Sequence, residues 1–206
     1  MTNHFKDKVY LITGGASGIG LATARLLKAQ GAQPILWDIN DPALQTFGSE
    51  LGMETHLVDI TDHIQVKDAT ESLVMQHGRL DGVVHCAGVM TTGLFENIDI
   101  ERHCQITNIN LNGTLIVCHA TLPHLKRVNG SLILLSSVSA FYGPPEFASY
   151  AASKSAILNF AQALRIELGD SGVHLGVVTP HLVDTPLLSQ ENRKAKLTSS
   201  TSVFVT

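Results

Sequence analysis

The sequence of 206 residues is poor in cysteine and contains no metal-binding motif. Its three cysteines, Cys86, Cys104 and Cys118, do not form a C-x-x-C pair, and its ten histidines form neither H-E-x-x-H nor H-x-x-x-H. An odd, scattered set of cysteines indicates a reducing compartment without a disulfide framework. Because the histidines lack the spacing of metal ligands, we expect no metal site.

The chain also lacks an excess of positive charge and any long apolar run. Lysine and arginine number 14 against 18 acidic residues, which gives a net charge of −4. A nucleic-acid-binding protein normally carries a basic stripe, so we expect no nucleic-acid partner. No apolar run reaches the roughly 18 residues that span a membrane, and the first 15 residues contain no apolar region typical of a signal peptide. We therefore expect no membrane partner and a cytoplasmic location.

Linkers and internal repeats are absent as well. A length of 206 residues suffices for one well-cored domain and is short for two. No segment rich in proline, serine or one charge interrupts the sequence before its tail. We therefore predict a single domain over residues 1–206.

Short apolar runs alternate with longer amphipathic segments along the chain. The predicted strands span residues 8–13, 34–38, 54–59, 80–88, 130–137 and 173–180. The predicted helices span residues 18–30, 41–51, 62–77, 99–127 and 150–169. Apolar strands separated by helices indicate parallel pairing with helices on both faces. With right-handed crossovers, this pattern predicts an α/β fold with a doubly wound, Rossmann-like sheet of about six strands. Pro34 is expected at the start of its strand, because proline provides no N–H to a sheet.

A glycine-rich turn, TGGASGIG, follows the first predicted strand. Gly14, Gly18 and Gly20 would let the backbone approach a pyrophosphate, and the next helix would offer its N-terminal N–H groups. A tight turn between a strand and a helix also uses glycine, so the turn alone does not establish a nucleotide site.

Asp38, eighteen residues after Gly20, supports the nucleotide interpretation. It ends the second predicted strand, where a carboxylate can accept hydrogen bonds from both ribose hydroxyls of an adenosine. The alternative is a turn residue without a ligand. Ser17, Ile39 and Asn40 bring no positive charge that could receive a 2′-phosphate. The site therefore predicts NAD rather than NADP.

The segment SYAASKSA places a tyrosine and a lysine four residues apart. On a helix, Tyr150 and Lys154 would share one face, and the small residues between them would leave room for a bulky ligand. An ammonium group beside a tyrosine predicts a lowered tyrosine pKa. From the spacing alone, an ordinary polar pair on an amphipathic helix remains the alternative.

Over almost its whole length the chain resembles the short-chain dehydrogenase/reductase family, through T-G-x-x-x-G-x-G at residues 13–20 and through the Tyr–Lys pair. The resemblance implies a catalytic tetrad of Asn110, Ser137, Tyr150 and Lys154. Ser137 lies thirteen residues before Tyr150, and Asn110 lies three before Gly113. By resemblance, Ser137 holds the substrate oxygen, Lys154 binds the nicotinamide ribose and Asn110 anchors a water in a proton relay.

The same resemblance implies a complete NAD site. Its predicted residues are Gly14, Ser17, Gly18, Ile19, Gly20, Asp38, Asp59, Ile60, Cys86, Ala87, Gly88, Tyr150, Lys154, Pro180 and Thr185. Asp59 matches the family residue that contacts the adenine amino group, and Thr185 matches the one that contacts the nicotinamide carboxamide. Cys86 stands where the family usually has asparagine, and His181 stands where it usually has glycine.

The function implied is an NAD(H)-dependent oxidoreductase that interconverts a secondary alcohol and a ketone, with Tyr150 as the general acid and base. The substrate would be a small alcohol or ketone. The alternative is a non-catalytic dinucleotide-binding protein, such as a redox-responsive regulator or an inactive paralogue. Candidates for an apolar substrate pocket, unless they belong to the core or a lid, are Met90, Phe95, Phe141, Tyr142, Phe147 and Leu182.

The resemblance also bears on assembly and on the tail. Family members usually form dimers or tetramers through the helices near 99–127 and 150–169, so we expect a homodimer or homotetramer. The family pattern continues with a substrate-covering segment, a helix and a seventh strand, and we expect the seventh strand to be missing here. We therefore expect residues 187–206 to form a lid remnant or mobile tail, and the sixth strand to keep an unpaired edge.

Overall fold

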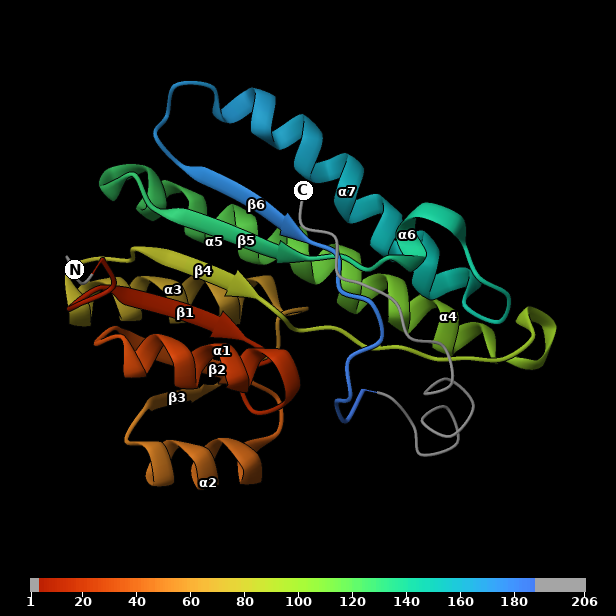
Figure 1. Ribbon diagram of the computed structural model, residues 1–206, viewed down its shortest axis with the longest axis horizontal. Helices are drawn as coiled ribbons and strands as arrows, with labels where there is room; N and C mark the ends of the chain where they lie inside the picture. The colour runs from red at the N-terminus through yellow and green to blue at the C-terminus, as the bar shows by residue number, and fades with distance from the viewer. Residues whose placement is uncertain (1–3, 188–206) are drawn as a thin grey trace.

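A computed structural model describes residues 4–187 of the chain. Its six strands form one parallel sheet in the order β3-β2-β1-β4-β5-β6 (Figure 1). The strands are β1 (Val9–Thr13), β2 (Gln33–Asp38), β3 (Glu54–Leu57), β4 (Gly82–His85), β5 (Ser131–Leu135) and β6 (His174–Val178). The predicted α/β fold with a doubly wound parallel sheet is confirmed. The prediction for the tail falls, from residue 188 onward, outside the described residues.

The helices that connect the strands have recognisable local signals. They are α1 (Gly18–Ala29), α2 (Asp41–Leu51), α3 (His63–His77), α4 (Ile100–Thr107), α5 (Gly113–Val128), α6 (Ser139–Tyr142) and α7 (Ala148–Leu168). Asn40 caps α2 and Asp62 caps α3 through side-chain oxygens that accept N–H groups of the first turn. Gly52 and Gly78 end these helices in the left-handed conformation.

The prediction of one continuous helix over residues 99–127 is wrong in its centre. Between α4 and α5 the chain forms a π-helical segment, η2 (Asn108–Asn112). Such a segment adds one residue to a helical turn, and apolar periodicity does not reveal it. Two short elements, α6 and the 3₁₀ turn η1 (Phe95–Asn97), were not predicted either. Strand β2 begins at Gln33, so Pro34 is its second residue.

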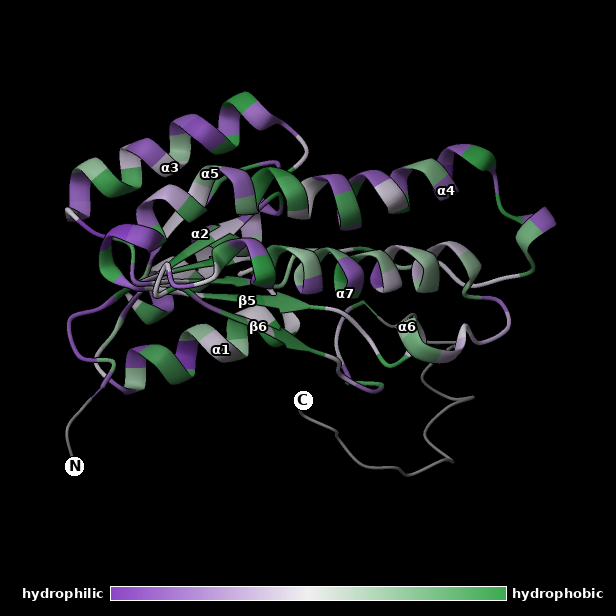
Figure 2. Ribbon diagram, turned by 90° about the horizontal axis from the view of Figure 1, so that it is seen from above, coloured by the Kyte–Doolittle hydropathy of each residue, from purple (hydrophilic) through white to green (hydrophobic). Residues whose placement is uncertain are grey.

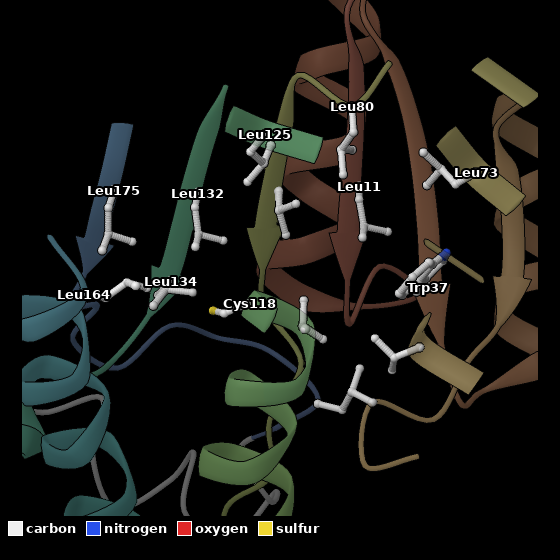
Figure 3. Close-up of a cluster of buried hydrophobic side chains, with 14 of the residues drawn as sticks. Leu11, Trp37, Leu73, Leu80, Cys118, Leu125, Leu132, Leu134, Leu164 and Leu175 are labelled. Atoms are coloured by element: carbon white, nitrogen blue, oxygen red, sulfur yellow. The ribbon is translucent and has the colours of Figure 1, made fainter. Parts of the chain in front are cut away.

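Successive residues of the strands point to opposite faces of the sheet and enter two separate cores. On one face, Leu11, Trp37 and Leu132 pack with Cys118 and Leu125 of α5 (Figure 3). Helices α3, α5 and α7 lie on this side and α1 lies on the other (Figure 2). The opposite core joins Ile12 and Leu36 to Ala24 of α1 and Leu44 of α2.

All six strands point the same way, so their carboxyl ends share one edge of the sheet. From β1 the chain adds β2 and β3 on one side of the sheet, and it then returns to add β4, β5 and β6 on the other side of β1. The neighbours β1 and β4 therefore mark the point where the direction of strand addition changes. Sheets of this kind bind ligands at such a switch point. No helix within residues 4–187 has the length and apolar character needed to cross a membrane.

Candidate active site

A cleft of about 780 Å³ lies at the carboxyl ends of the strands. Every residue predicted to contact the cofactor lines it, as does the predicted catalytic Ser137. Asn110 does not line the cleft, because its side chain is fully buried behind the wall. The cofactor-binding and catalytic residues predicted from the sequence therefore line the cleft, apart from Asn110. Which of them contact the cofactor and which are catalytic remains a prediction.

The glycine turn forms one end of the cleft. Gly14 and Gly18 have φ angles of +64° and +48°, which strain any residue with a side chain. A Cβ atom on Gly20 would lie 2.2 Å from the Gly14 carbonyl oxygen, and one on Gly14 would lie 2.8 Å from the backbone nitrogen of Ala87. Helix α1 starts here, and Ser17 at its N-cap forms no side-chain capping bond. The turn therefore presents bare backbone at the N-terminus of a helix.

Asp38 is fixed by backbone N–H groups at the end of β2. Its Oδ2 accepts a hydrogen bond from the N–H of Ala16 at 3.0 Å, within the glycine turn. Its Oδ1 accepts hydrogen bonds from the N–H groups of Ile39 at 2.8 Å and Asn40 at 3.0 Å. Asp59 is held similarly, since one of its oxygens accepts hydrogen bonds from the backbone and the hydroxyl of Thr61. Both carboxylates thus have fixed positions in the wall of the cleft.

Tyr150 and Lys154 lie on one face of α7, as their spacing predicted. The Lys154 ammonium lies 5.8 Å from the centroid of the Tyr150 ring, and it donates a hydrogen bond to the carbonyl of Leu135 at 3.0 Å. Ser137, which follows β5, lies near enough to the Tyr150 hydroxyl to act on its pKa. Both side chains are buried, with exposed fractions of 8% for Tyr150 and 5% for Lys154. The three side chains form one connected group.

The predicted lowering of the Tyr150 pKa is wrong for the chain by itself. Burial raises the pKa of Tyr150 above its ordinary value of 10.0, and the hydrogen bond from Ser137 only partly opposes this. Burial also lowers the pKa of Lys154 to about 8, although the nearby Cys86 thiol acts in the opposite direction. Spacing revealed that the two groups are neighbours, but it did not reveal how little water reaches them.

Ser137 has a second partner that the sequence did not single out. Its Oγ accepts hydrogen bonds from the Ser139 hydroxyl at 3.0 Å and from the Ser139 N–H at 3.2 Å. Because these two bonds occupy the oxygen as an acceptor, the Ser137 proton points toward another acceptor, such as the Tyr150 oxygen. The repeated serines of the segment SSVS were the only sequence signal for this arrangement.

Asn110 lies in the π-helical segment and reaches toward the cleft wall from behind. Its Oδ1 accepts a hydrogen bond from the N–H of Val89 at 2.8 Å. Its Nδ2 donates to the carbonyl of Val89 at 2.9 Å and to the hydroxyl of Ser153 at 3.0 Å. Both amide hydrogens are therefore used within the protein, and the side chain connects the chain after β4 to helix α7. A Cβ atom on Gly88 would lie 3.1 Å from Asn110 Oδ1 and 3.4 Å from Lys154 Nζ.

Cys86, the departure from the family pattern, is a partly buried thiol in the cleft wall. Burial raises its pKa to about 12, and the charge of Lys154 only partly offsets this effect. Its N–H donates a hydrogen bond to the Thr13 carbonyl at 3.1 Å, which continues the pairing of β4 with β1. The thiol is therefore protonated near neutral pH, which makes it a weak nucleophile and a poor metal ligand. Within residues 4–187, no group of three His, Cys, Asp or Glu side chains could hold a metal ion.

The apolar candidates divide into two groups. Met90, Tyr142, Phe147 and Leu182 line the cleft. Phe95 lies elsewhere, stacked on His103 with ring centroids 4.4 Å apart, and Phe141 is exposed on α6 outside the lining. His181, the other departure from the family pattern, also lines the cleft.

Comparisons with known proteins show which family the chain resembles. The short chain dehydrogenase family profile matches residues 8–196. The 3-oxoacyl-[acyl-carrier-protein] reductase FabG of Thermotoga maritima is 32% identical, over 94% of this chain and 81% of its own length. The meso-2,3-butanediol dehydrogenase of Serratia marcescens is 31% identical, over 88% of this chain and 73% of its own. A short-chain type dehydrogenase/reductase structure from Mycobacterium ulcerans has a TM-score of 0.86 and 32% identity, covering 92% of this chain and 74% of that one.

Proposed function

This chain belongs to the short-chain dehydrogenase family of oxidoreductases, and we propose that it interconverts a secondary alcohol and a ketone with NAD(H). One observation carries the proposal: the side chains of Tyr150, Ser137 and Lys154 line one cleft, and the Lys154 ammonium lies 5.8 Å from the centroid of the tyrosine ring. A proton donor, a hydrogen-bond donor and a positive charge therefore meet in the wall of one cleft.

The walls of the cleft fit a nicotinamide dinucleotide. The bare backbone of the glycine turn, with Gly14 and Gly18 at positive φ, gives a pyrophosphate room to approach the N–H groups of α1. Asp38 would receive the adenosine ribose, and its charge disfavours a 2′-phosphate at the same place. Ile39, beside it, is exposed and uncharged. These residues support NAD over NADP.

The reaction needs a hydride and a proton to leave the alcohol. When bound, the dinucleotide accepts or supplies the hydride. Ser137 donates a hydrogen bond to the substrate oxygen, because its own oxygen is already occupied by Ser139. Tyr150 takes the proton of that oxygen in oxidation and returns it in reduction. The positive charge of Lys154 stabilises the negative charge that develops on Tyr150 in the first direction.

Burial of Tyr150 determines its protonation state in the chain without cofactor. A raised pKa keeps the phenol protonated at neutral pH, which makes it an acid that can protonate a ketone oxygen. Oxidation requires the phenolate, and that form is disfavoured until further positive charge lies near the ring. Before the cofactor binds, the chain therefore holds Tyr150 in the acid form that reduction of a ketone requires.

A panel of substrates with NADH or NAD⁺, followed at 340 nm, tests the proposal. The relatives suggest two members of the panel, a 3-oxoacyl thioester and meso-2,3-butanediol. The cleft lining around Met90, Tyr142, Phe147 and Leu182 favours apolar ketones as further members. Turnover that Tyr150→Phe abolishes would support the proposal. NADH binding without turnover of any member would instead favour a non-catalytic dinucleotide-binding protein. Assembly as a homodimer or homotetramer stays a prediction.

A further inference from the structure

A buried histidine joins the two halves of the site at the switch point of the sheet. His85 is the last residue of β4 and lies beside Thr13, the last residue of β1, in the strand register. Only 2% of its surface is exposed. Its Nδ1 lies 2.7 Å from the Thr13 hydroxyl, and its Nε2 lies 3.0 Å from the Thr114 hydroxyl on α5. Both ring nitrogens therefore have a hydroxyl partner.

The hydrogen bonds around the ring determine its tautomer. The Thr114 hydroxyl donates its single proton to the carbonyl of Asn110, at 2.6 Å. Thr114 must then accept from His85, so Nε2 carries the proton of the neutral ring. The unprotonated Nδ1 accepts a hydrogen bond from the Thr13 hydroxyl. The Thr13 oxygen remains available as an acceptor, and it receives the N–H of Ala87 at 3.3 Å. Every hydroxyl and both ring nitrogens are satisfied in this one arrangement.

This chain of hydrogen bonds connects two parts of the site that are distant in sequence. Its one end is Ala87, whose backbone nitrogen lies against Gly14 of the glycine turn. Its other end is the carbonyl of Asn110, in the π-helical segment, whose side chain holds Val89. We propose that His85, as the neutral Nε2–H tautomer, is a positioning residue that fixes the π-helical segment and Asn110 relative to the cofactor-binding turn.

Two further observations agree with this role. Burial lowers the pKa of His85 to about 3, and the positive charge of Lys154 acts in the same direction. The ring therefore stays neutral and cannot exchange protons with substrate near neutral pH, which excludes a role as a general acid. No substrate or cofactor reaches it, since it does not line the cleft. Its influence on the reaction must pass through Thr13 and Thr114.

The proposal rests on the proposed oxidoreductase function, but its first test needs no turnover. Long-range ¹H–¹⁵N NMR of the whole chain reports the tautomer of each histidine, and His85→Gln identifies the His85 signals. We expect the Nε2–H tautomer at pH 8 and at pH 5. An Nδ1–H tautomer, or titration of the ring between these pH values, would overturn the proposal even if the enzyme is active.

The second test uses two threonines of the same helix. Thr114→Val removes the hydroxyl that links His85 to Asn110. Thr121→Val is its matched control, because Thr121 is also buried in α5 and donates to the carbonyl four residues before it, that of Val117 at 2.8 Å. Each variant loses one hydrogen bond from a threonine hydroxyl to a helix carbonyl, but only Thr114 belongs to the hydrogen-bond network of His85. We expect the side-chain amide signals of Asn110 to shift in Thr114→Val and to stay unchanged in Thr121→Val.

Turnover adds a third readout. At saturating NADH and substrate, Thr114→Val should lower kcat about tenfold, the effect of one misplaced buried hydrogen bond. Thr114→Ser should restore kcat, because it keeps the hydroxyl, and Thr121→Val should leave kcat unchanged. Equal effects of the two valine variants on kcat and on the Asn110 signals would assign His85 a packing role only. A wild-type chain without turnover, but with the expected tautomer and Asn110 shifts, would contradict the proposed reaction and leave the positioning network supported.

Discussion

The side chain of Asn110 forms two hydrogen bonds with the backbone of a single residue, Val89. Oδ1 accepts from the Val89 N–H at 2.8 Å, and Nδ2 donates to the Val89 carbonyl at 2.9 Å. Val89 follows Gly88 in the wall of the cleft, so the asparagine replaces the pairing that a neighbouring strand would give this segment. The amide therefore holds the backbone of the cleft wall in place.

Asn110→Ala should destabilise the chain and reduce turnover together. The substitution leaves the N–H and the carbonyl of Val89 without their side-chain partner and removes one of the hydrogen bonds of Ser153, which should lower the free energy of unfolding by about 2–4 kcal/mol. Urea denaturation measures this loss. Asn112→Ala is the control, because Asn112 lies in the same π-helical segment but forms an exposed bond with Asn108. A loss in Asn110→Ala as small as that of the control would show that Val89 is held by other contacts.

Tyr150→Phe should lower kcat by roughly 10²–10⁴-fold, the usual contribution of a general acid or base. NADH binding, measured by fluorescence, should persist, because the phenyl ring retains its packing against Phe147. Tyr10→Phe provides a control in the core at the opposite end of the strands and should keep its kcat. Retention of more than about a tenth of the wild-type kcat by Tyr150→Phe would exclude the assigned role.

The fold could be predicted because its signals are local. Continuous apolar strands, amphipathic helices and the turn chemistry at Gly14 and Asp38 each occupy a few neighbouring residues. Strand ends also fix the site, since residues that follow parallel strands meet at one edge of the sheet. The cleft lining therefore contains every residue predicted to contact the cofactor, although it lacks Asn110, Phe95 and Phe141.

The features that the sequence did not reveal depend on distant partners or on burial. His85 is 72 residues from Thr13 and 29 residues from Thr114, and nothing in its neighbourhood marks it as different from the other histidines. The π-helical turn at Asn110 has no motif in the sequence that distinguishes it from an ordinary helical turn. The direction of the Tyr150 pKa shift depends on how much water reaches the hydroxyl. Packing determines this access of water, and the spacing of residues in the sequence does not reveal it.

Replacing Asp38 by Ser together with Ile39 by Arg should shift cofactor preference from NAD toward NADP. Loss of a charged hydrogen-bond acceptor should lower kcat/KM for NAD about ten- to a hundredfold, while the arginine offers a partner for a 2′-phosphate. Steady-state kinetics with both cofactors measures the change. Asp38→Asn is the control, since it removes the charge but keeps an oxygen for the N–H of Ala16. Equal kcat/KM for NAD and NADP in the wild type would contradict the assignment of Asp38.

His85 should make the stability of the chain depend on pH below about 6.5. Its pKa is about 3 in the folded chain against an ordinary 6.5, so between these values the unfolded chain binds a proton that the folded chain does not. Stability from this residue is complete above pH 6.5 and is lost as the pH falls toward 3, by up to about 1.4 kcal/mol per pH unit.

His85→Gln removes the titrating ring and should flatten this part of the profile. Urea denaturation of both proteins at pH 7, 6 and 5 measures the difference in slope, which is independent of any constant packing cost of the glutamine. Between pH 7 and 5, the wild type should lose about 2 kcal/mol more than the variant. Parallel profiles would show that the ring accepts a proton in the folded chain, which would also exclude the neutral tautomer on which the hydrogen-bond network depends.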